Sequence, residues 1–175
     1  MLLGGARSGK SALAVRWGRA YGGPVTFVAT GEPGDDEMTA RIRRHRAERP
    51  AGWTTVEAPA DPTGAVTGAA HDALVIVDCL TLWVANVFGD VDDDAVLARA
   101  DAFGAAAAAR TAPTVVVTNE VGTGIVPADP VTRRYRDLLG GVNTAVVAHG
   151  AAAWLLVAGR ALPLHVPPER PAGLP

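Results

Sequence analysis

The sequence predicts an α/β fold, a P-loop NTPase domain of the RecA-like kind with three layers, a mostly parallel central sheet and an antiparallel edge strand. Two observations predict it. Short, almost wholly apolar runs alternate with helical segments, which is the pattern of a parallel sheet covered on both faces. A glycine-rich stretch ending in Gly-Lys-Ser follows the first apolar run, and such a loop between a strand and a helix binds nucleotide phosphates.

The glycine-rich stretch fits the pattern G-x-x-x-x-G-K-[ST], whose backbone N–H groups wrap a polyphosphate. It consists of Gly4, Gly5, Ala6, Arg7, Ser8, Gly9, Lys10 and Ser11. Lys10 can reach the β and γ phosphates, and the Ser11 hydroxyl can bind Mg²⁺. Lys10 is also the only lysine among 16 Lys and Arg residues, which indicates that this position needs an ammonium. We therefore expect a nucleoside triphosphate site with Lys10 as a catalytic residue.

The elements around this loop follow from local patterns. Only the apolar residues 1–3 precede it, so we expect either a short first strand or a chain that begins further upstream. A helix is predicted over 11–21, because two glycines and a proline end it. The β-branched and aromatic run 25–29 predicts a strand. Acidic residues at the start and basic residues at the end predict a helix over 35–48.

The middle of the chain continues the alternation. Residues 53–57 alternate like a strand, and the Ala- and Gly-rich stretch 59–71 predicts a loose helix. Four apolar residues followed by an acid predict a buried strand over 74–78. An apolar helix is expected over 80–88, and an Ala-rich helix of high intrinsic propensity over 95–110.

The last third supplies two more strands and a long helix. The run 114–118 predicts a buried strand, and 130–148 predicts a helix. Another apolar strand is expected over 154–158, and an edge strand over 162–166. The proline-rich tail 167–175 is expected to be extended or disordered.

Composition fits one compact domain, expected over residues 1–166 and followed by the Pro-rich tail. The chain has 175 residues, 49% of them hydrophobic, and a net charge of −2, which does not indicate a general nucleic-acid or membrane-surface partner. Cys79 is the only cysteine, so no internal disulfide can form. Neither a signal peptide nor a long apolar run is present. We therefore expect a cytoplasmic protein with no nucleic-acid partner and no membrane insertion.

Two carboxylates follow predicted strands. Asp78 ends a buried strand, where the acid of a P-loop NTPase binds Mg²⁺ or its water. Alternatively, it caps the helix that follows. Glu57 also ends a strand. A single acid there fits a functional carboxylate and an ordinary exposed strand end equally well.

His45 lies in a helix rich in arginine. The arginines are Arg41, Arg43, Arg44, Arg46 and Arg49. Guanidinium groups can stabilise phosphate charge, and a neutral imidazole is a competent nucleophile. A solvated basic face or an RNA contact explains the same pattern. Besides a covalent nucleotidyl transferase, the residues thus leave open a simple P-loop kinase or ATPase with a structural His45, and a nucleotide-binding switch or RNA-associated module.

Further motifs are the segments 36–38 and 41–50, the stretch Thr-Asn-Glu-Val-Gly-Thr-Gly-Ile-Val-Pro at 118–127, and the segments 135–137 and 141–143. Together with the glycine-rich loop, they resemble the bifunctional adenosylcobinamide kinase / adenosylcobinamide-phosphate guanylyltransferase family of cobalamin biosynthesis. The resemblance runs over nearly the whole chain, and the stretch 118–127 is its most specific part.

The resemblance implies two reactions in sequence. The aminopropanol hydroxyl of adenosylcobinamide is phosphorylated by a nucleoside triphosphate, ATP or GTP. GMP is then transferred from GTP to adenosylcobinamide phosphate through a covalent guanylyl-histidine, which falls on His45. Some relatives carry a histidine pair where this chain has Arg44-His45. The resemblance also implies a homo-oligomer, a trimer.

Site residues are implied in the same way. Mg²⁺ or another divalent cation would be held by Ser11 and Asp78. The nucleotide contacts implied beyond the glycine-rich loop are Ala29, Thr30, Gly31, Arg46, Ala47, Glu48, Arg49, Glu57 and Asp78.

Overall fold

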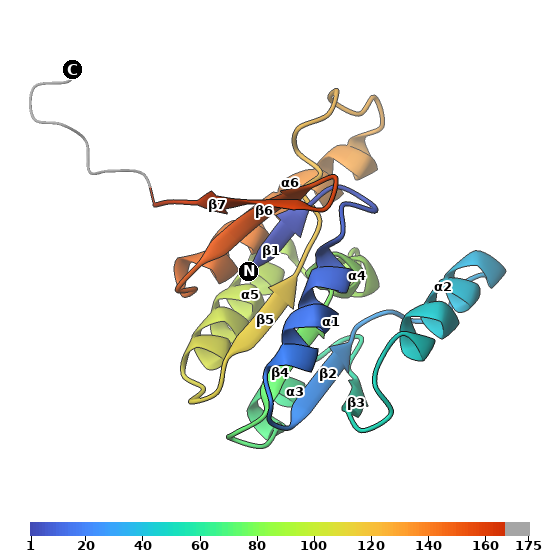
Figure 1. Cartoon of the computed structure of the whole chain (residues 1–175). Helices are drawn as coiled ribbons and strands as arrows, with labels where there is room; N and C mark the ends of the chain where they lie inside the picture. The colour runs from blue at the N-terminus through green and yellow to red at the C-terminus, as the bar shows by residue number, and fades with distance from the viewer. Residues whose placement is uncertain (167–175) are drawn as a thin grey trace, which may run out of the picture.

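The computed structural model describes residues 1–166, which form a seven-stranded sheet between two layers of helices (Figure 1). The strands are β1 (Leu2–Gly4), β2 (Val25–Ala29), β3 (Thr54–Glu57), β4 (Leu74–Asp78), β5 (Thr114–Val117), β6 (Ala153–Val157) and β7 (Arg160–Leu164). The helices are α1 (Lys10–Ala20), α2 (Asp36–Ala47), α3 (Pro62–Gly68), α4 (Leu80–Val87), α5 (Asp93–Ala108) and α6 (Pro130–Ala148). Within this described part, no helix is both long and apolar enough to cross a membrane.

The strand order across the sheet is β3-β2-β4-β5-β1-β6-β7. Neighbouring strands are parallel throughout, except that β6 and β7 are antiparallel. The predicted P-loop fold, with a mostly parallel sheet and an antiparallel edge strand, is therefore confirmed. The first strand is short, as expected, but it pairs with a parallel neighbour on each side.

Strand β4 shows how the sheet is buried on both faces. Val75 and Val77 pack into one apolar cluster with residues of α3, α4, α5 and α6, whereas Leu74 and Ile76 pack into a second cluster beneath α1. All four side chains are at most 4% exposed. Burial on both faces explains why this strand is a continuous apolar run rather than an alternating one.

Six strands run in the same direction, so their carboxyl ends meet at one edge of the sheet. The glycine-rich loop leaves β1 at this edge, and Asp78 ends β4 there, with β5 between them. Ligands of open parallel sheets bind outside the carboxyl ends of the strands. The fold thus places the predicted phosphate loop and the predicted acid at the edge where a nucleotide binds.

Two helices begin at aspartate caps that the sequence prediction did not place. Helix α5 starts at Asp93 rather than at the start of the predicted range 95–110, because the Asp92 side chain accepts a backbone N–H and caps it. The loose helix predicted over 59–71 shortens to α3, which Asp61 caps. Asp61 and Asp92 therefore mark the starts of helices, where a negative carboxylate also interacts favourably with the helix dipole.

The edge strand was predicted two residues too late. It begins at Arg160 rather than at the start of 162–166, because Ala158 and Gly159 both adopt positive φ and form a tight hairpin turn after β6. The predicted tail 167–175 lies outside the described residues, and the domain boundary at 166 stays a prediction.

Candidate active site

The glycine-rich loop folds around the side chain of Lys10, which is only 7% exposed. Its Nζ donates to the carbonyl oxygens of Gly4 at 2.7 Å and Gly5 at 2.8 Å, and lies 3.3 Å from the Ser8 hydroxyl oxygen. Burial lowers the pKa of Lys10, and the nearby carboxylate of Asp78 opposes this shift. The loop therefore holds its one ammonium in a defined position.

Neighbouring strands hold this loop on two sides. After β5, the backbone N–H of Glu120 donates to the Gly4 carbonyl at 3.2 Å. From the β6–β7 turn, the N–H of Gly159 donates to the Ser8 carbonyl at 3.0 Å. The loop is thus fixed by the sheet that carries it, so its backbone is organised before any phosphate binds.

Asp78 stands at the end of β4 and does not cap the next helix. The cap residue of α4 is Cys79, and no side-chain capping bond is made. The cap alternative for Asp78 is therefore wrong. Burial raises the pKa of the Cys79 thiol to about 11, so this cysteine is a protonated, buried side chain.

A buried threonine ties the end of β2 to the end of β4. Thr30 is fully buried, and its hydroxyl donates to the Cys79 carbonyl at 2.7 Å and accepts the Cys79 N–H at 2.8 Å. The Asn86 side-chain amide donates to the Thr30 carbonyl at 2.7 Å. Thr30 therefore positions the backbone at this edge.

A cleft of about 660 Å³ lies over this edge of the sheet. One wall consists of loop residues 6–11 together with Ala12, Asp78, Cys79, Val117 and Asn119; the other is α2 and its end, through Glu37, Ala40, Arg41, Arg44, His45 and Glu48. His45 and Lys10 thus line the same cavity from opposite walls. The volume lies in the range of ligand pockets.

A smaller recess of about 50 Å³ adjoins the cleft. Ala29, Gly31, Glu57, Arg46 and Arg49 are among its lining residues. It shares His45, Arg41, Asp78 and Cys79 with the cleft, so these four residues stand at the boundary between the two hollows.

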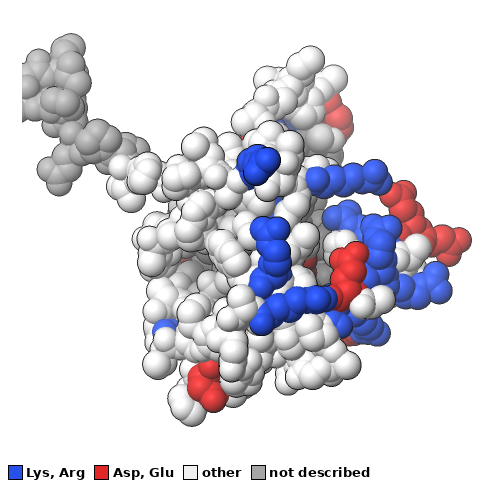
Figure 2. Space-filling view, in the orientation of Figure 1, with Lys and Arg blue, Asp and Glu red and all other residues white. Residues whose placement is uncertain are grey.

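Helix α2 projects from the β3 side of the sheet and has no buried residue (Figure 1). Arg46 forms an ion pair with Glu57 of β3, and the Arg49 guanidinium lies 3.8 Å from the centre of the Phe27 ring. Burial lowers the pKa of Arg49. Figure 2 shows basic side chains gathered over this helix and the adjoining part of α1. The helix is therefore attached at its carboxyl end, and its basic side chains lie across the cleft from the glycine-rich loop.

Ser11 and Asp78 both line the cleft, and hydroxyl and carboxylate oxygens are ligands that Mg²⁺ accepts. Among the described residues, no group of three or more His, Cys, Asp or Glu side chains could hold a metal alone. A nucleotide-bound Mg²⁺ takes only one or two protein ligands, because phosphate oxygens and waters supply the rest. The donor set therefore fits the predicted cation.

Not every predicted contact lines a hollow. Thr30 and Ala47 line neither, and Gly4 and Gly5 act through the carbonyls that hold Lys10. The predicted residues that line one or both hollows are Ala6, Arg7, Ser8, Gly9, Lys10, Ser11, Ala29, Gly31, His45, Arg46, Glu48, Arg49, Glu57 and Asp78.

Sequence reasoning gave no separate role to three polar residues that line the cleft. It treated the arginines of α2 as a group and did not separate Arg41 and Arg44, which line the cleft, from Arg43, which lines neither hollow. The available signal was helical spacing, since Arg41 and Arg44 lie three apart on the side that carries Glu37 and Glu48. Asn119 follows a predicted strand and also lines the cleft.

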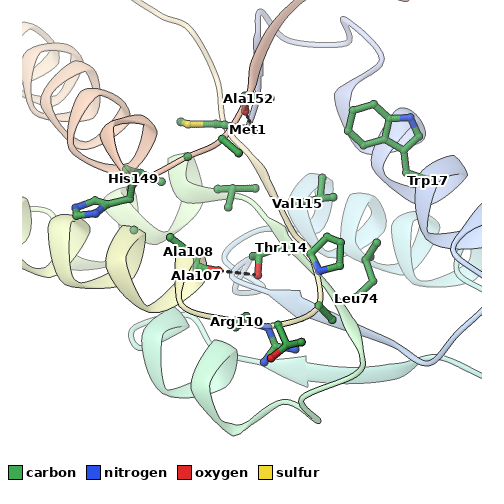
Figure 3. A pocket seen from close by; sticks show the side chains of 18 of the residues that line it. Met1, Trp17, Leu74, Ala107, Ala108, Arg110, Thr114, Val115, His149 and Ala152 are labelled. Carbon is green, nitrogen blue, oxygen red and sulfur yellow. Dashed lines mark hydrogen bonds between the residues drawn. The ribbon is translucent and has the colours of Figure 1, made fainter. Parts of the chain in front are cut away.

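A third hollow, of about 480 Å³, lies at the opposite edge of the sheet (Figure 3). Its lining is mainly apolar and includes Trp17 and Trp154. Arg110 at its rim donates to four backbone carbonyls, and the His149 ring pairs with Asp101 at 2.7 Å. With these polar groups already paired, this hollow is not suited to a polyphosphate.

A glycine-rich phosphate loop faces a basic, histidine-bearing helix across a cleft of nucleotide size, which defines a class of protein, the P-loop enzymes of phosphoryl or nucleotidyl transfer. The sequence model of the family described as cobinamide kinase / cobinamide phosphate guanyltransferase matches residues 1–164. The chain belongs to this family. The predicted family, and with it the predicted bifunctional transferase, is confirmed.

The sequence similarity between this chain and its curated relatives extends over almost their whole length. The chain is 37% identical to the bifunctional adenosylcobalamin biosynthesis protein CobP of Pseudomonas aeruginosa, covering 96% of this chain and 98% of that protein. It is 37% identical to the bifunctional adenosylcobalamin biosynthesis protein CobU of Escherichia coli and 38% identical to that of Salmonella typhimurium, covering 91% of this chain and 95% of each relative.

Lys10→Ala is expected to lower kcat/KM by about 100- to 1000-fold for both phosphorylation and guanylyl transfer, because each reaction consumes a nucleoside triphosphate whose phosphates we expect this ammonium to bind. Lys10→Arg should restore little of either activity. The Lys10 Nζ fits between the carbonyl oxygens of Gly4, at 2.7 Å, and Gly5, at 2.8 Å, whereas a guanidinium is larger and planar. Steady-state assays of each reaction with both variants check this. Recovery of Lys10→Arg to within about threefold of the natural enzyme would mean that any positive charge suffices.

Proposed function

We propose that one nucleotide cleft serves both reactions and that His45 is the residue that carries GMP. In the first reaction, the aminopropanol hydroxyl of adenosylcobinamide takes a phosphoryl group from a nucleoside triphosphate, ATP or GTP. In the second, GMP passes from GTP to His45 and then to adenosylcobinamide phosphate, giving adenosylcobinamide-GDP. The observation that carries the proposal is that His45 and Lys10 line the same cleft.

Each reaction can be written with the residues of this cleft. In phosphorylation, the substrate hydroxyl oxygen bonds to the γ phosphorus, and the bond from that phosphorus to its bridging oxygen breaks. The electron pair of the broken bond leaves with the nucleoside diphosphate, and the hydroxyl proton passes to water. Lys10 and the loop N–H groups bind the phosphates and stabilise the charge that develops on them. A divalent cation at Ser11 and Asp78 would neutralise further phosphate charge when bound.

His45 suits the second reaction because imidazole is a nucleophile near neutral pH and also a good leaving group from phosphorus. Its position at the boundary of the cleft and the recess lets a nucleotide extend to both sides of the ring. A covalent intermediate divides one difficult transfer into two easier ones. A P-loop kinase with a structural histidine would need no residue at this boundary.

The experiment uses GTP labelled at the α or at the γ phosphate. After incubation with a divalent cation and denaturation, only the α label should remain on the protein, with the acid lability and alkali stability of a phosphoramidate. Mass spectrometry should place the added GMP on the peptide that contains His45. Phosphorylation of adenosylcobinamide without any retained α label would favour the simple kinase, and nucleotide binding without turnover would favour the binding module.

The proposal extends to assembly and location. We propose a homo-oligomer, a trimer, acting in the cytoplasm, with adenosylcobinamide and its phosphate bound next to the cleft. Strand β7 supports an assembly, because among residues 1–166 it pairs with β6 alone and carries Leu162 and Leu164 exposed on the edge of the sheet. Light scattering should give three times the mass of one chain, whereas the mass of a single chain would contradict the oligomer.

A further inference from the structure

Helix α2 carries its arginines on two adjoining faces. Arg41 and Arg44 line the cleft opposite the glycine-rich loop, whereas Arg46 and Arg49 line the smaller recess, which Arg41 also touches. Arg41 and Arg44 are three residues apart, as neighbours on one face of a helix are. Arg46 lies near the carboxyl end of α2, and Arg49 lies just beyond the helix. Arg43, on the same helix, lines neither hollow. The arginines of α2 and of the residues just after it therefore line two different hollows, the cleft and the recess.

The two pairs differ in whether they already have partners. Arg46 is neutralised by its ion pair with Glu57. The Arg49 guanidinium is stacked on the Phe27 ring, and its buried Nε has no hydrogen-bond partner in the described chain. The guanidinium groups of Arg41 and Arg44 make no hydrogen bond or ion pair with the rest of the described chain, although both residues line the cleft. Guanidinium groups bind phosphate oxygens through two parallel N–H bonds, so two unpaired guanidiniums in a polar cleft are suited to anionic oxygens.

The positions of Lys10 and His45 indicate which oxygens these are. Lys10 and Arg41 line the same cleft. Burial has the largest effect on the pKa of Lys10, and the positive charge of Arg41 lowers this pKa further. With the α phosphorus of GTP at the ring of His45, the β and γ phosphates extend into the cleft toward the loop. They then lie between Lys10 on one wall and Arg41 and Arg44 on the other.

We propose that Arg41 and Arg44 bind the β and γ phosphates of GTP and hold the departing pyrophosphate while His45 is guanylylated. This inference rests on the function proposed above and deepens it. In the step, the lone pair of one imidazole nitrogen forms the N–P bond, and the bond from the α phosphorus to its bridging oxygen breaks. Its electron pair leaves with pyrophosphate, and the proton of the other ring nitrogen passes to water. The guanidiniums neutralise charge that grows on the leaving group, so they act on this step more than on the discharge of GMP to the acceptor.

The experiment compares Arg41→Gln and Arg44→Gln with the matched control Arg43→Gln, an exposed arginine of the same helix. Three readouts are taken: the single-turnover rate at which [α-³²P]GTP labels the enzyme, the pyrophosphate concentration that half-maximally discharges the isolated guanylyl-enzyme, and the rate of its discharge by adenosylcobinamide phosphate. The Arg44→Lys variant tests whether a point charge replaces the planar group.

Arg41→Gln and Arg44→Gln are expected to slow labelling by about 100-fold each and to raise the half-maximal pyrophosphate concentration by about tenfold or more. Discharge to the acceptor should stay within about twofold, and Arg43→Gln should match the natural enzyme in all three readouts. Labelling and pyrophosphate discharge unchanged in both glutamine variants would overturn the inference while leaving the proposed function intact. Failure of the natural enzyme to take α label would overturn the proposed function itself, and the inference with it.

Discussion

Replacing His45 by alanine is expected to remove guanylyl transfer by about 10⁴-fold or more while leaving adenosylcobinamide phosphorylation within a few-fold of the natural rate. The proposed phosphoryl step uses the glycine-rich loop and Lys10, and no hydrogen bond joins either of them to the His45 ring. His45 is only half-buried on a helix without buried residues, so its loss should change the free energy of unfolding by less than about 1 kcal/mol.

The measurement follows both products from one preparation: adenosylcobinamide phosphate should accumulate in the variant, and adenosylcobinamide-GDP should be missing. His149→Ala is the matched control, because that histidine lies at the opposite edge of the sheet, paired with Asp101. It should keep both activities. Guanylyl transfer that survives in His45→Ala would assign the covalent step to another residue, and equal loss of both activities would assign the ring a role in binding.

The parts of this fold that the sequence predicts well are those fixed by local chemistry. The loop 4–11 is recognisable because its glycines and Lys10 must occupy set positions around a phosphate, whatever the remaining sequence does. Strand β4 is recognisable because burial on both faces leaves only apolar residues before Asp78. Helix ends are predicted less well, because aspartate is favoured both in turns and at helix N-caps, and Asp92 is such a cap.

The candidate site depends on contacts between distant segments, which local patterns do not specify. That α2 faces the loop follows from the strand order, which puts β2 and β4 side by side and β5 between β4 and β1. The pairing of Arg46 with Glu57 follows from the parallel register of β2 and β3. The sequence shows five arginines around His45, and helical spacing groups Arg41 with Arg44, but which hollow each arginine lines depends on the tertiary fold.

Thr30 illustrates a different limit. The resemblance to the family suggests a nucleotide contact at this position, whereas the structure shows a fully buried side chain that bonds to the backbone of Cys79. A hydroxyl can form hydrogen bonds with a ligand or with a neighbouring strand. Which partner it has depends on whether the side chain points toward the cleft or into the sheet. Sequence alone does not reveal that direction.

Gly4→Ala is expected to destabilise the folded protein by about 3–5 kcal/mol and to remove both activities. Gly4 adopts a φ of +150°, which side chains rarely accept, and a Cβ added there would stand 2.3 Å from the backbone oxygen of Leu156 in β6. Because that oxygen belongs to a paired strand, it cannot move aside without breaking the ladder between β1 and β6. Relief therefore has to come from the loop itself, which also positions the Gly4 carbonyl for Lys10.

The neighbouring Gly5→Ala provides the control, since a Cβ at Gly5 would meet nothing within 4 Å and no positive φ is required there. Its free energy of unfolding, measured by urea denaturation, should stay within about 0.5–1 kcal/mol of the natural value, while that of Gly4→Ala falls by several times this amount. Comparing the two variants then shows whether the loss of stability comes from the close backbone packing at Gly4 or from replacing any glycine of the loop. Equal stability of the two would mean that β1 and β6 can separate at this point, and the short first strand would then not be what holds the phosphate loop against the sheet.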